Sequence, residues 1–350
     1  MGDPAGVGPE VLVGGWANPR LHQCCRPVAI GHPELLRRAA IVMGLDQIVV
    51  EIAGPEDAEP SPEQIPCIRA VDDDVLDVTP ATIDPRAGQA AYDALVRAAE
   101  LAMAGRVDGI TTAPLHKAAL WEAGHHYPGH TELLAELCGV DDFAMMLYLA
   151  HDERVRGPAG LGVVHVTLHM ALSEVFAALT TDAVLAKIRL ADAAMAPLVA
   201  QPSPAGQPTV VAQPARIGVC ALNPHAGESG LFGRDEATII QPAVQRARAE
   251  GIDVEGPYPA DTLMVRAADG EFDAVVAMYH DQGHIALKLL GMHRAVNVTL
   301  GLPIVRTSVA HGTAFDLAWR GVAQTGSMIE AVRVASQLAL ERVTPSPAGR

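Results

Sequence analysis

Aromatic residues and positive charge are both scarce in this chain of 350 residues. Aromatic side chains make up 4% of the sequence, so aliphatic residues and alanine must fill the cores that an apolar fraction of 49% allows. Lysine and arginine number 25 against 41 acidic residues, which gives a formal net charge of −16. This balance argues against nucleic acid or an anionic membrane as a partner, whereas a small anionic substrate needs only a few local cations.

Cysteine motifs, long apolar runs and nucleotide-binding motifs are missing as well. The five cysteines form no C-x-x-C motif. In a protein of this size, a reducing, cytoplasmic compartment is the simplest explanation of their number and spacing. No apolar run reaches the roughly 18 residues that a membrane helix requires, and we expect no secretory signal peptide. The glycine-rich stretch at residues 1–10 is neither G-x-G-x-x-G nor a P-loop, and alone it indicates either a plain loop or a close approach to a ligand.

The apolar segments alternate in type along the chain, which predicts an α/β fold with a mostly parallel sheet. We expect loops at residues 54–66 and 256–262, and a flexible connection at the proline-rich residues 202–214. The predicted strands are 27–31, 48–52, 107–112, 144–149, 161–166, 217–222, 274–278, 296–300 and 304–308. The main predicted helices are 33–43, 88–104, 182–199, 236–250 and 328–340, with shorter ones starting near residues 130 and 173.

Three histidines share one position relative to the predicted strands. His169, His225 and His280 each lie just beyond the C-terminal end of an apolar segment. Ligands of open α/β sheets bind at this edge, and three imidazoles on one ion leave a coordination position free for catalysis. A single histidine in such a place is more often a plain loop residue, and residues 279–284 also fit a helix start with Asp281 near its cap.

A few acidic and basic residues complete the candidate site. Asp261 and Asp281 can orient ligating imidazoles or bind a divalent ion, or they can serve as a turn residue and a helix cap. Lys288 is either a solvated residue or the partner of a substrate carboxylate or phosphate. Asn297 lies inside an apolar strand, where a polar amide is costly to bury without a partner.

A series of motifs runs in order along nearly the whole chain: Met1–Glu10, Thr112–Lys117, Gly129–Glu132, Leu222–Glu228, Pro259–Thr262, Tyr279–Gly283, and Asn297–Pro303 with Arg306–Ser308. This series resembles the 4-hydroxythreonine-4-phosphate dehydrogenase family, which acts in pyridoxine biosynthesis. The resemblance implies oxidation of a secondary alcohol of a small anionic substrate with NAD or NADP, after which the β-keto acid loses carbon dioxide.

The resemblance also implies a two-domain α/β/α fold like that of isocitrate and isopropylmalate dehydrogenases, with the active site in the interdomain cleft of a homodimer. We expect residues 1–125 and 262–343 to form a discontinuous first domain. Residues 126–261 are expected to form a second domain that carries the dimer interface and the metal site. Residues 344–350 are expected to be a disordered tail.

Individual residues receive roles from the same resemblance. His169, His225 and His280 match the ligands of one divalent metal (zinc, magnesium, cobalt or manganese), one of them supplied across the dimer. The substrate-binding positions are matched by His130, Thr131, Lys288, Asn297 and Arg306. The expected cofactor-binding residues are Gly2, Asp3, Gly6, Asn297, Leu300 and Gly301. The expected catalytic residues are Asp261, Asp281 and Lys288.

Several departures from the family pattern leave the substrate open. The family usually has an apolar strand before the Gly-Asp-Pro loop, so we expect either a start upstream of Met1 or a missing strand. Residues 151–160 look longer than usual, while 164–169 and 309–312 resemble paralogues acting on 4-phospho-D-erythronate, 4-phospho-D-threonate or dihydrodiol dicarboxylates. We expect a phosphorylated hydroxy acid, and a cation such as Lys117 or Arg234 in the site would favour it. A phosphate acyltransferase or a ligand-binding regulator is the remote alternative.

Overall fold

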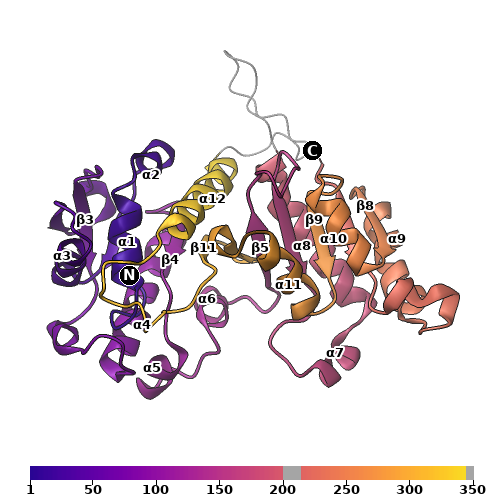
Figure 1. Cartoon of the computed structure of the whole chain (residues 1–350), viewed down its shortest axis with the longest axis horizontal. Coiled ribbons are helices and arrows are strands. Elements are labelled where there is room, and N and C mark those ends of the chain that lie inside the picture. The colour runs from indigo at the N-terminus through magenta and orange to yellow at the C-terminus, as the bar shows by residue number, and fades with distance from the viewer. Residues whose placement is uncertain (200–213, 344–350) are drawn as a thin grey trace, which may run out of the picture. The chain divides into compact units, whose positions relative to one another are not determined.

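The computed structural model describes residues 1–199 and 214–343. Nearly all of the connection expected at residues 202–214, and the tail expected at 344–350, lie outside the described residues. The chain divides into two compact units, of which the first combines Met1–Phe143 with Leu302–Arg350 and the second is Ala144–Gly301. Each unit consists of helices and β-strands, as predicted for an α/β protein (Figure 1).

The first unit contains a small parallel sheet with the strand order β1-β3-β2 and a parallel pair, β4 and β11. The strands are β1 (Ala29–Gly31), β2 (Ile48–Ile52), β3 (Gln64–Arg69), β4 (Gly109–Thr112) and β11 (Val305–Val309). The α-helices are α1 (Gly8–Trp16), α2 (Pro19–Cys24), α3 (Pro33–Val42), α4 (Pro85–Met103), α5 (Lys117–Glu122), α6 (His130–Cys138) and α12 (Gly326–Val343). Short 3₁₀ turns are η1 (Pro55–Asp57) and η2 (Asp73–Asp77).

A polar residue followed by proline fixes where three of these helices begin. Asn18, His32 and Asp84 each precede a proline in the first turn of α2, α3 and α4, respectively. The side chain of each accepts a hydrogen bond of 2.9–3.1 Å from the backbone N–H two residues later. Proline suits the first helical turn because it has no N–H to satisfy, and the capping side chain satisfies one that remains.

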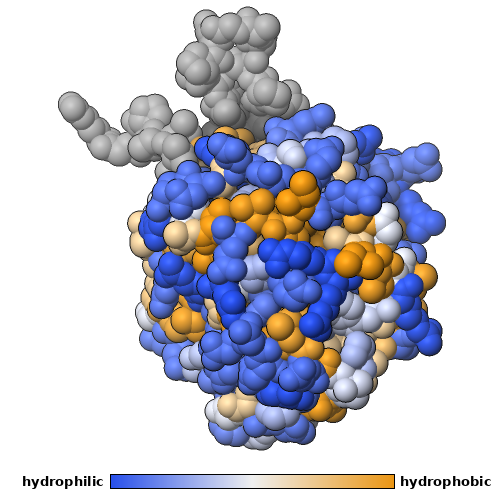
Figure 2. Space-filling view, turned by 90° about the vertical axis from the view of Figure 1, so that its left-hand side faces the viewer, coloured by the Kyte–Doolittle hydropathy of each residue, from blue (hydrophilic) through white to orange (hydrophobic). Residues whose placement is uncertain are grey.

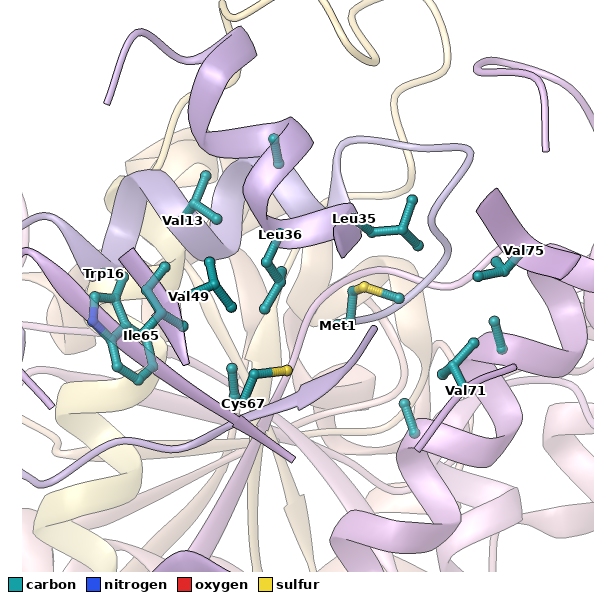
Figure 3. Close-up of a cluster of buried hydrophobic side chains, with 14 residues drawn as sticks. Met1, Val13, Trp16, Leu35, Leu36, Val49, Ile65, Cys67, Val71 and Val75 are labelled. Carbon is teal, nitrogen blue, oxygen red and sulfur yellow. The ribbon is translucent and has the colours of Figure 1, made fainter. Parts of the chain in front are cut away.

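The core around β1, β2 and β3 is almost entirely aliphatic (Figure 3). Val13, Leu36 and Ile65 are fully buried there, and Trp16 is the one aromatic residue among the buried members of this cluster. The indole N–H of Trp16 donates to the carbonyl oxygen of Ser61 at 2.8 Å. Replacing one of these large aliphatic side chains by alanine is expected to cost about 2–5 kcal/mol. The low aromatic content is therefore compensated by aliphatic packing, as predicted.

Some large apolar side chains of the first unit remain on its surface. Ile41 of α3 is 76% exposed and Ile48 of the edge strand β2 is 64% exposed. Figure 2 shows the side on which α3 and β3 lie, where apolar residues form patches between hydrophilic ones. Exposed apolar residues are common on protein surfaces, so their exposure alone identifies no partner.

The second unit is built on strands in the order β10-β5-β6-β9-β7-β8. The pairs β6–β9, β9–β7 and β7–β8 are parallel, whereas β5 is antiparallel to β6 and to β10. The strands are β5 (Ala144–Leu149), β6 (Leu161–His165), β7 (Ile217–Cys220), β8 (Val254–Tyr258), β9 (Ala274–Ala277) and β10 (Val296–Leu300). The α-helices are α7 (Leu172–Ala178), α8 (Thr181–Val199), α9 (Gln241–Ala249), α10 (Ala260–Ala268) and α11 (His280–Gly291). Shorter helical segments are η3 (Pro224–Gly230), the π-helix η4 (Glu236–Ile240) and η5 (Met292–Arg294).

Helices cover both faces of β6, which explains why all of its residues are buried. A Cβ at Gly162 would meet Met195 of α8, whereas Val163, the next residue of β6, lies against Gly283 of α11. Because side chains alternate along a strand, α8 and α11 pack on opposite faces of β6. The face that carries Val163 also carries His165, which therefore points toward α11.

The structure differs from the sequence prediction in its local elements. Strands β3 and β8 and helix α10 occupy segments that were expected, in whole or in part, to be loops. Pro66 lies within β3 and Pro257 within β8, and proline normally argues against a strand because it lacks a ladder donor. In parallel sheets tertiary pairing outweighed this local signal. None of the described helices is both long and apolar enough to cross a membrane.

The limits of the two units also differ from the expected domains. Residues 126–143 belong to the first unit, and residues 262–301 belong to the second. Strand pairing explains the latter difference, because β9 pairs with both β6 and β7 and β10 pairs with β5. Helix α6 packs against α4, which keeps residues 130–138 in the first unit. The first unit itself is formed by two separate segments of the chain.

Candidate functional site

The three histidines predicted to bind a metal follow three neighbouring strands of the second unit. His169 lies in the bend after β6, His225 lies in the loop after β7, and His280 begins α11 after β9. Strands β6, β9 and β7 are adjacent and parallel, so their C-terminal ends lie along one edge of the sheet. The structure therefore confirms the strand-end position that the three residues share.

His169 and His280 lie close together at this edge. The centroids of their rings are 5.8 Å apart. Two imidazoles that each bind one zinc ion through a nitrogen at about 2.0–2.1 Å have centroids roughly 5 Å apart, so the separation of these two rings is close to that of two ligands of one ion. Nδ1 of His280 is 2.6 Å from the carboxylate of Asp281, to which it donates, so Nε2 keeps a lone pair for a ligand.

His225, in contrast, lies on a left-handed stretch of backbone. Residues His225–Ser229 within η3 all have left-handed backbone angles, with φ between 42° and 77°. Such a conformation costs about 1–2 kcal/mol for each non-glycine residue, so neighbouring contacts must hold it. Among the described residues no group of three or more histidine, cysteine or acidic side chains could hold a metal, so His225 does not join His169 and His280 within the chain.

Glu236 holds this left-handed loop in place. Glu236 is only 6% exposed. Its carboxylate accepts hydrogen bonds from the backbone N–H groups of Leu222 at 2.9 Å and Asn223 at 2.7 Å. The side chain of Asn223 donates to the same carboxylate at 3.1 Å. A Cβ at Gly227 would lie 2.7 Å from Glu236 Oε2, so the loop packs directly on the carboxylate. Glu236 was not predicted from the sequence, because no local pattern marks a residue whose side chain bonds to the end of an earlier strand.

Two further histidines that the sequence analysis did not select pack against His280. The ring of His284 stacks on that of His280, with centroids 3.8 Å apart and planes inclined by 11°. Nδ1 of His284 is 3.1 Å from Nε2 of His165, so one nitrogen donates to the other. Burial lowers the pKa of His165 to about 3 and that of His284 to about 4, so both rings are neutral at pH 7. The signal that could have identified His284 is its spacing of one helical turn from His280.

Lys288 lies on the same face of α11. His280, His284 and Lys288 follow one another at intervals of four residues, which places their side chains along one side of a helix. Burial and the charge of His280 are the main causes of the lowered pKa of His284, and the charge of Lys288 contributes to it. Of the two predicted carboxylates, Asp281 bonds to His280, whereas Asp261 of α10 is exposed and accepts a bond from the N–H of Thr262.

In the first unit, three predicted substrate-binding residues lie near one another. Arg306 of β11 is 2% exposed, and its guanidinium donates to Thr112 Oγ1 at 2.8 Å. Burial lowers the pKa of Arg306 to about 10, so the group stays charged at neutral pH. Burial, and then the charge of Arg306, hold the pKa of His130 well below its ordinary value. His130 and Thr131 begin α6, and the positive end of the helix dipole at this N-terminus favours an anion.

The predicted cofactor-binding loop of the first unit is tightly packed. The N–H of Asp3 donates to the carbonyl oxygen of Pro114 at 2.8 Å, and its carboxylate accepts from the N–H of Ala5 at 2.8 Å. A Cβ at Gly2 would lie 2.4 Å from Pro114 O, and one at Gly6 would also collide with its neighbours. These glycines therefore make room for the protein's own backbone. Burial raises the pKa of Asp3 to about 6.

The remaining predicted residues lie on β10, directly after it, or on the surface of their unit. Asn297 of β10 is half-buried, and its Nδ2 donates to the sulfur of Met145 at 3.1 Å, a weak acceptor. Leu300 ends β10 and the exposed Gly301 follows it. Lys117 and Arg234, the two further cations expected to favour phosphate, are both exposed.

A cavity of about 530 Å³ lies within the first unit. Side chains of β1, β4, α4 and α12 line it, and most of them are apolar. Gly2 and His130 reach its wall, whereas Arg306 and Thr131 are not among the residues that line it. Its apolar wall does not suit a phosphate or a carboxylate, so we do not place the anionic substrate there.

Comparison with known proteins identifies the family of the chain. The model of the family described as pyridoxal phosphate biosynthetic protein PdxA matches residues 23–335. The chain is 43% identical to the D-threonate 4-phosphate dehydrogenase of Pectobacterium atrosepticum, over 97% of this chain and 98% of the relative. The crystal structure of a 4-hydroxythreonine-4-phosphate dehydrogenase from Klebsiella pneumoniae matches with 41% identity and a TM-score of 0.82, over 97% of both chains. A terephthalate 1,2-cis-dihydrodiol dehydrogenase from Burkholderia xenovorans matches with 29% identity and a TM-score of 0.63, over 96% of both chains.

These three relatives carry the names of dehydrogenases with different substrates. Their names support the predicted oxidoreductase and give no support to acyl transfer or to a regulator. The match in sequence covers almost the whole chain, including both compact units. The chain therefore belongs to the family of the pyridoxal phosphate biosynthetic protein PdxA, and it is a dehydrogenase.

Proposed function

We propose that the protein is a metal-dependent NAD(P) dehydrogenase that oxidises a phosphorylated hydroxy acid and decarboxylates the product. The observation that carries this proposal is the pair of His169 and His280, which follow the parallel strands β6 and β9. Their ring centroids are 5.8 Å apart, and Asp281 orients the ring of His280. His225 is the proposed third ligand. The family resemblance implies that one of the three histidines is supplied across a homodimer, and we assign this role to His225 because it does not join the other two within the described chain. Its strained loop supports this role, because strained backbone persists where function needs it.

The imidazole donors fit a divalent metal that accepts nitrogen. Zinc and cobalt bind imidazole readily, whereas magnesium and manganese prefer oxygen ligands. A bound metal would act as a Lewis acid toward the substrate hydroxyl group and the ketone formed from it. Asp281 keeps the proton on Nδ1 of His280, which leaves Nε2 for the metal.

Lys288 is the proposed residue for proton transfer or carboxylate binding. It lies two helical turns from His280 on the same face of α11, where a substrate held by the metal site would be within reach. In the oxidation, the hydroxyl proton leaves to a basic group and the hydride leaves to the nicotinamide ring. The resulting β-keto acid then loses carbon dioxide. Asp261 stays a predicted catalytic residue of the family pattern.

The anionic end of the substrate is assigned to Arg306, His130 and Thr131. A buried guanidinium in an acidic chain, beside the N-terminus of α6, suits a phosphate or a carboxylate. The identities of 43% and 41% to enzymes named for phosphorylated substrates, against 29% to the dihydrodiol enzyme, favour phosphate. We therefore propose 4-phosphooxy-L-threonine as the default substrate, with 4-phospho-D-threonate or 4-phospho-D-erythronate close behind.

The proposal also includes the cofactor, the assembly and the compartment. NAD or NADP is assigned to Gly2, Asp3 and Gly6 together with Asn297, Leu300 and Gly301, on the family pattern. A homodimer with a shared active site in the interdomain cleft is proposed on the same ground. The five cysteines are free, which fits the cytoplasm.

The deciding experiment measures kcat/KM on one preparation. Purified protein receives NAD⁺ or NADP⁺, one of Zn²⁺, Co²⁺, Mn²⁺ or Mg²⁺, and one of four substrates. These are 4-phosphooxy-L-threonine, 4-phospho-D-threonate, 4-phospho-D-erythronate and a dihydrodiol dicarboxylate. We expect reduced cofactor and carbon dioxide with a phosphorylated acid, and none after removal of the metal by a chelator. A clear preference for the dicarboxylate would overturn the phosphate assignment, and silence with every combination would overturn the proposed reaction.

A further inference from the structure

A buried pair of histidines lies directly behind the proposed metal ligand His280. His284 stacks on the face of His280, and it is hydrogen-bonded at 3.1 Å to His165 at the end of β6. We propose that His165 and His284 are positioning residues, which hold the His280 ring in the orientation that lets its Nε2 bind a metal. This inference rests on the proposed metal site and adds two residues to it.

The ring of His280 is restrained at its edge and on its face. Asp281 accepts a bond from its Nδ1, but the Asp281 side chain is 68% exposed, so water competes with this contact. His284 covers the face of the same ring and is only 6% exposed. The stack with His284 is therefore the restraint that solvent weakens least, and it fixes the plane of the ring.

His284 is in turn held by His165, a buried residue of a central strand. His165 is 1% exposed and belongs to a strand with neighbours on both sides, β5 and β9. The N–H···N bond between the two rings is directional, so it sets the rotation of His284 about its side-chain bonds. Two leucines could fill a similar space, but they could not fix the plane of the ring that lies on His280. The hydrogen bond between the two rings offsets part of the cost of burying them.

Gly283 makes the contact between the two elements possible. A Cβ at this position would lie 2.5 Å from Nε2 of His165 and 2.6 Å from Cγ1 of Val163. Gly283 lies inside α11, where glycine costs about 1 kcal/mol relative to alanine. Its absent side chain lets α11 approach β6 closely enough for His284 to reach His165.

The pair also lies between two residues of the proposed site. On one face of α11, His284 is one helical turn from His280 and one turn from Lys288. A group that orients His284 therefore acts on the helix face that presents both the metal ligand and the proposed substrate residue. His284 therefore lies between the proposed metal ligand His280 and the proposed substrate residue Lys288. Its ring stacks on His280, so His280 is the residue that it orients.

The test measures Co²⁺ binding by the full-length, metal-free protein. The readouts are the dissociation constant for Co²⁺ and the visible absorption spectrum of the bound ion, which reports the geometry of its ligands. The variants are His284→Leu, His165→Leu, their combination, and His284→Phe, which keeps a stacking ring but loses the bond to His165. The matched control is Val164→Ala, because Val164 is fully buried in β6 next to His165 but points to the opposite face.

We expect His284→Leu to weaken Co²⁺ binding about tenfold and to change the spectrum, as loss of a residue that orients a metal ligand does. His165→Leu should weaken binding in the same direction, and His284→Phe should fall between wild type and His284→Leu. Because His165 acts through His284, the double variant should bind Co²⁺ no more weakly than His284→Leu alone. Val164→Ala should lower stability and leave the affinity and spectrum unchanged.

The Co²⁺ measurements test the role of the histidine pair and the existence of the metal site separately. Unchanged Co²⁺ affinity and an unchanged spectrum in both His284→Leu and His165→Leu would overturn the role of the pair. If His165→Leu does not fold, His284→Leu and His284→Phe decide the question on their own. A wild-type protein that binds no Co²⁺ would instead overturn the proposed metal site itself.

Discussion

Two regions of the second unit present histidines at the same edge of the sheet, but they hold them in different ways. Around His280 the backbone is a regular helix, and ring contacts with His169 and His284 restrain the side chain. Around His225 the backbone is left-handed over five consecutive residues, and a buried carboxylate, Glu236, fixes the chain. The first region restrains side chains through packing and the second restrains the backbone through hydrogen bonds. Mutations should therefore damage them by different routes.

The largest effect is expected from Glu236→Ala in the loop region. The substitution removes the acceptor of the N–H groups of Leu222 and Asn223 and of the Asn223 side chain. Removing a buried carboxylate that accepts three part-buried hydrogen bonds should lower the free energy of unfolding by about 3–5 kcal/mol. Urea denaturation measures the loss, and hydrogen exchange should show faster exchange in the loop.

Asp235→Ala is the matched control for this prediction. Asp235 is the neighbouring acid, and it accepts one bond of 2.9 Å from the side chain of Asn223. Its removal should cost about 1 kcal/mol, as for a single hydrogen bond. Equal losses from the two variants would show that Glu236 is not the main support of the loop.

A pH-dependent loss of stability should distinguish the histidine region. Folding lowers the pKa of His165 from 6.5 to about 3 and that of His284 from 6.5 to about 4, chiefly by burial. The unfolded chain therefore binds protons that the folded chain excludes, so stability present above pH 6.5 is lost as pH falls toward these values. We expect a loss on the order of 2 kcal/mol per ring at about pH 5.

The variant that replaces both His165 and His284 by leucine tests this dependence. Unfolding of metal-free protein in urea is compared for variant and wild type at about pH 7.5 and about pH 5. The wild type should lose more stability than the variant between the two values. Parallel losses would mean that the buried pair does not control acid sensitivity.

Two glycines allow the two regions to be compared with the same substitution. Gly283→Ala places a Cβ 2.5 Å from His165 Nε2 in a regular helix, whereas Gly227→Ala adds strain at a φ of +77° as well as a contact of 2.7 Å with Glu236. Overpacking alone costs about 1–3 kcal/mol, and a left-handed alanine adds about 1 kcal/mol more. We expect Gly227→Ala to be the more destabilising, as judged by the urea midpoint. The opposite order would show that the contact between α11 and β6 tolerates an added methyl group less well than the loop of His225 does.

The smallest effect on stability is expected from Asp281→Asn. The side chain is 68% exposed, so its hydrogen bond to His280 adds little to folding. Its proposed role is to keep the proton on Nδ1, so the change should weaken Co²⁺ binding by up to about tenfold while the unfolding curve stays the same. Unchanged Co²⁺ affinity would remove Asp281 from the proposed site.

Much of the fold followed from local sequence because the relevant signals are local. The apolar run that forms β9 was sufficient to predict a strand, and the pattern at residues 33–43 was sufficient to predict α3. The prolines in β3 and β8 were misleading, because pairing with neighbouring strands outweighed a local preference. The strand-end position of His169, His225 and His280 was predictable for the same reason as the strands.

The sequence by itself determined the family, the order of most helices and strands, and the residues that stand at the strand ends. Only the tertiary structure decided that β6, β9 and β7 are neighbours, that His284 meets His165 across 119 residues, and that Glu236 supports the loop of His225. The physical reason is that a helix or strand is specified by residues a few positions apart. A contact between distant residues depends on strand order and on how closely a helix approaches a sheet. At Gly283 that approach depends on the absence of a single side chain.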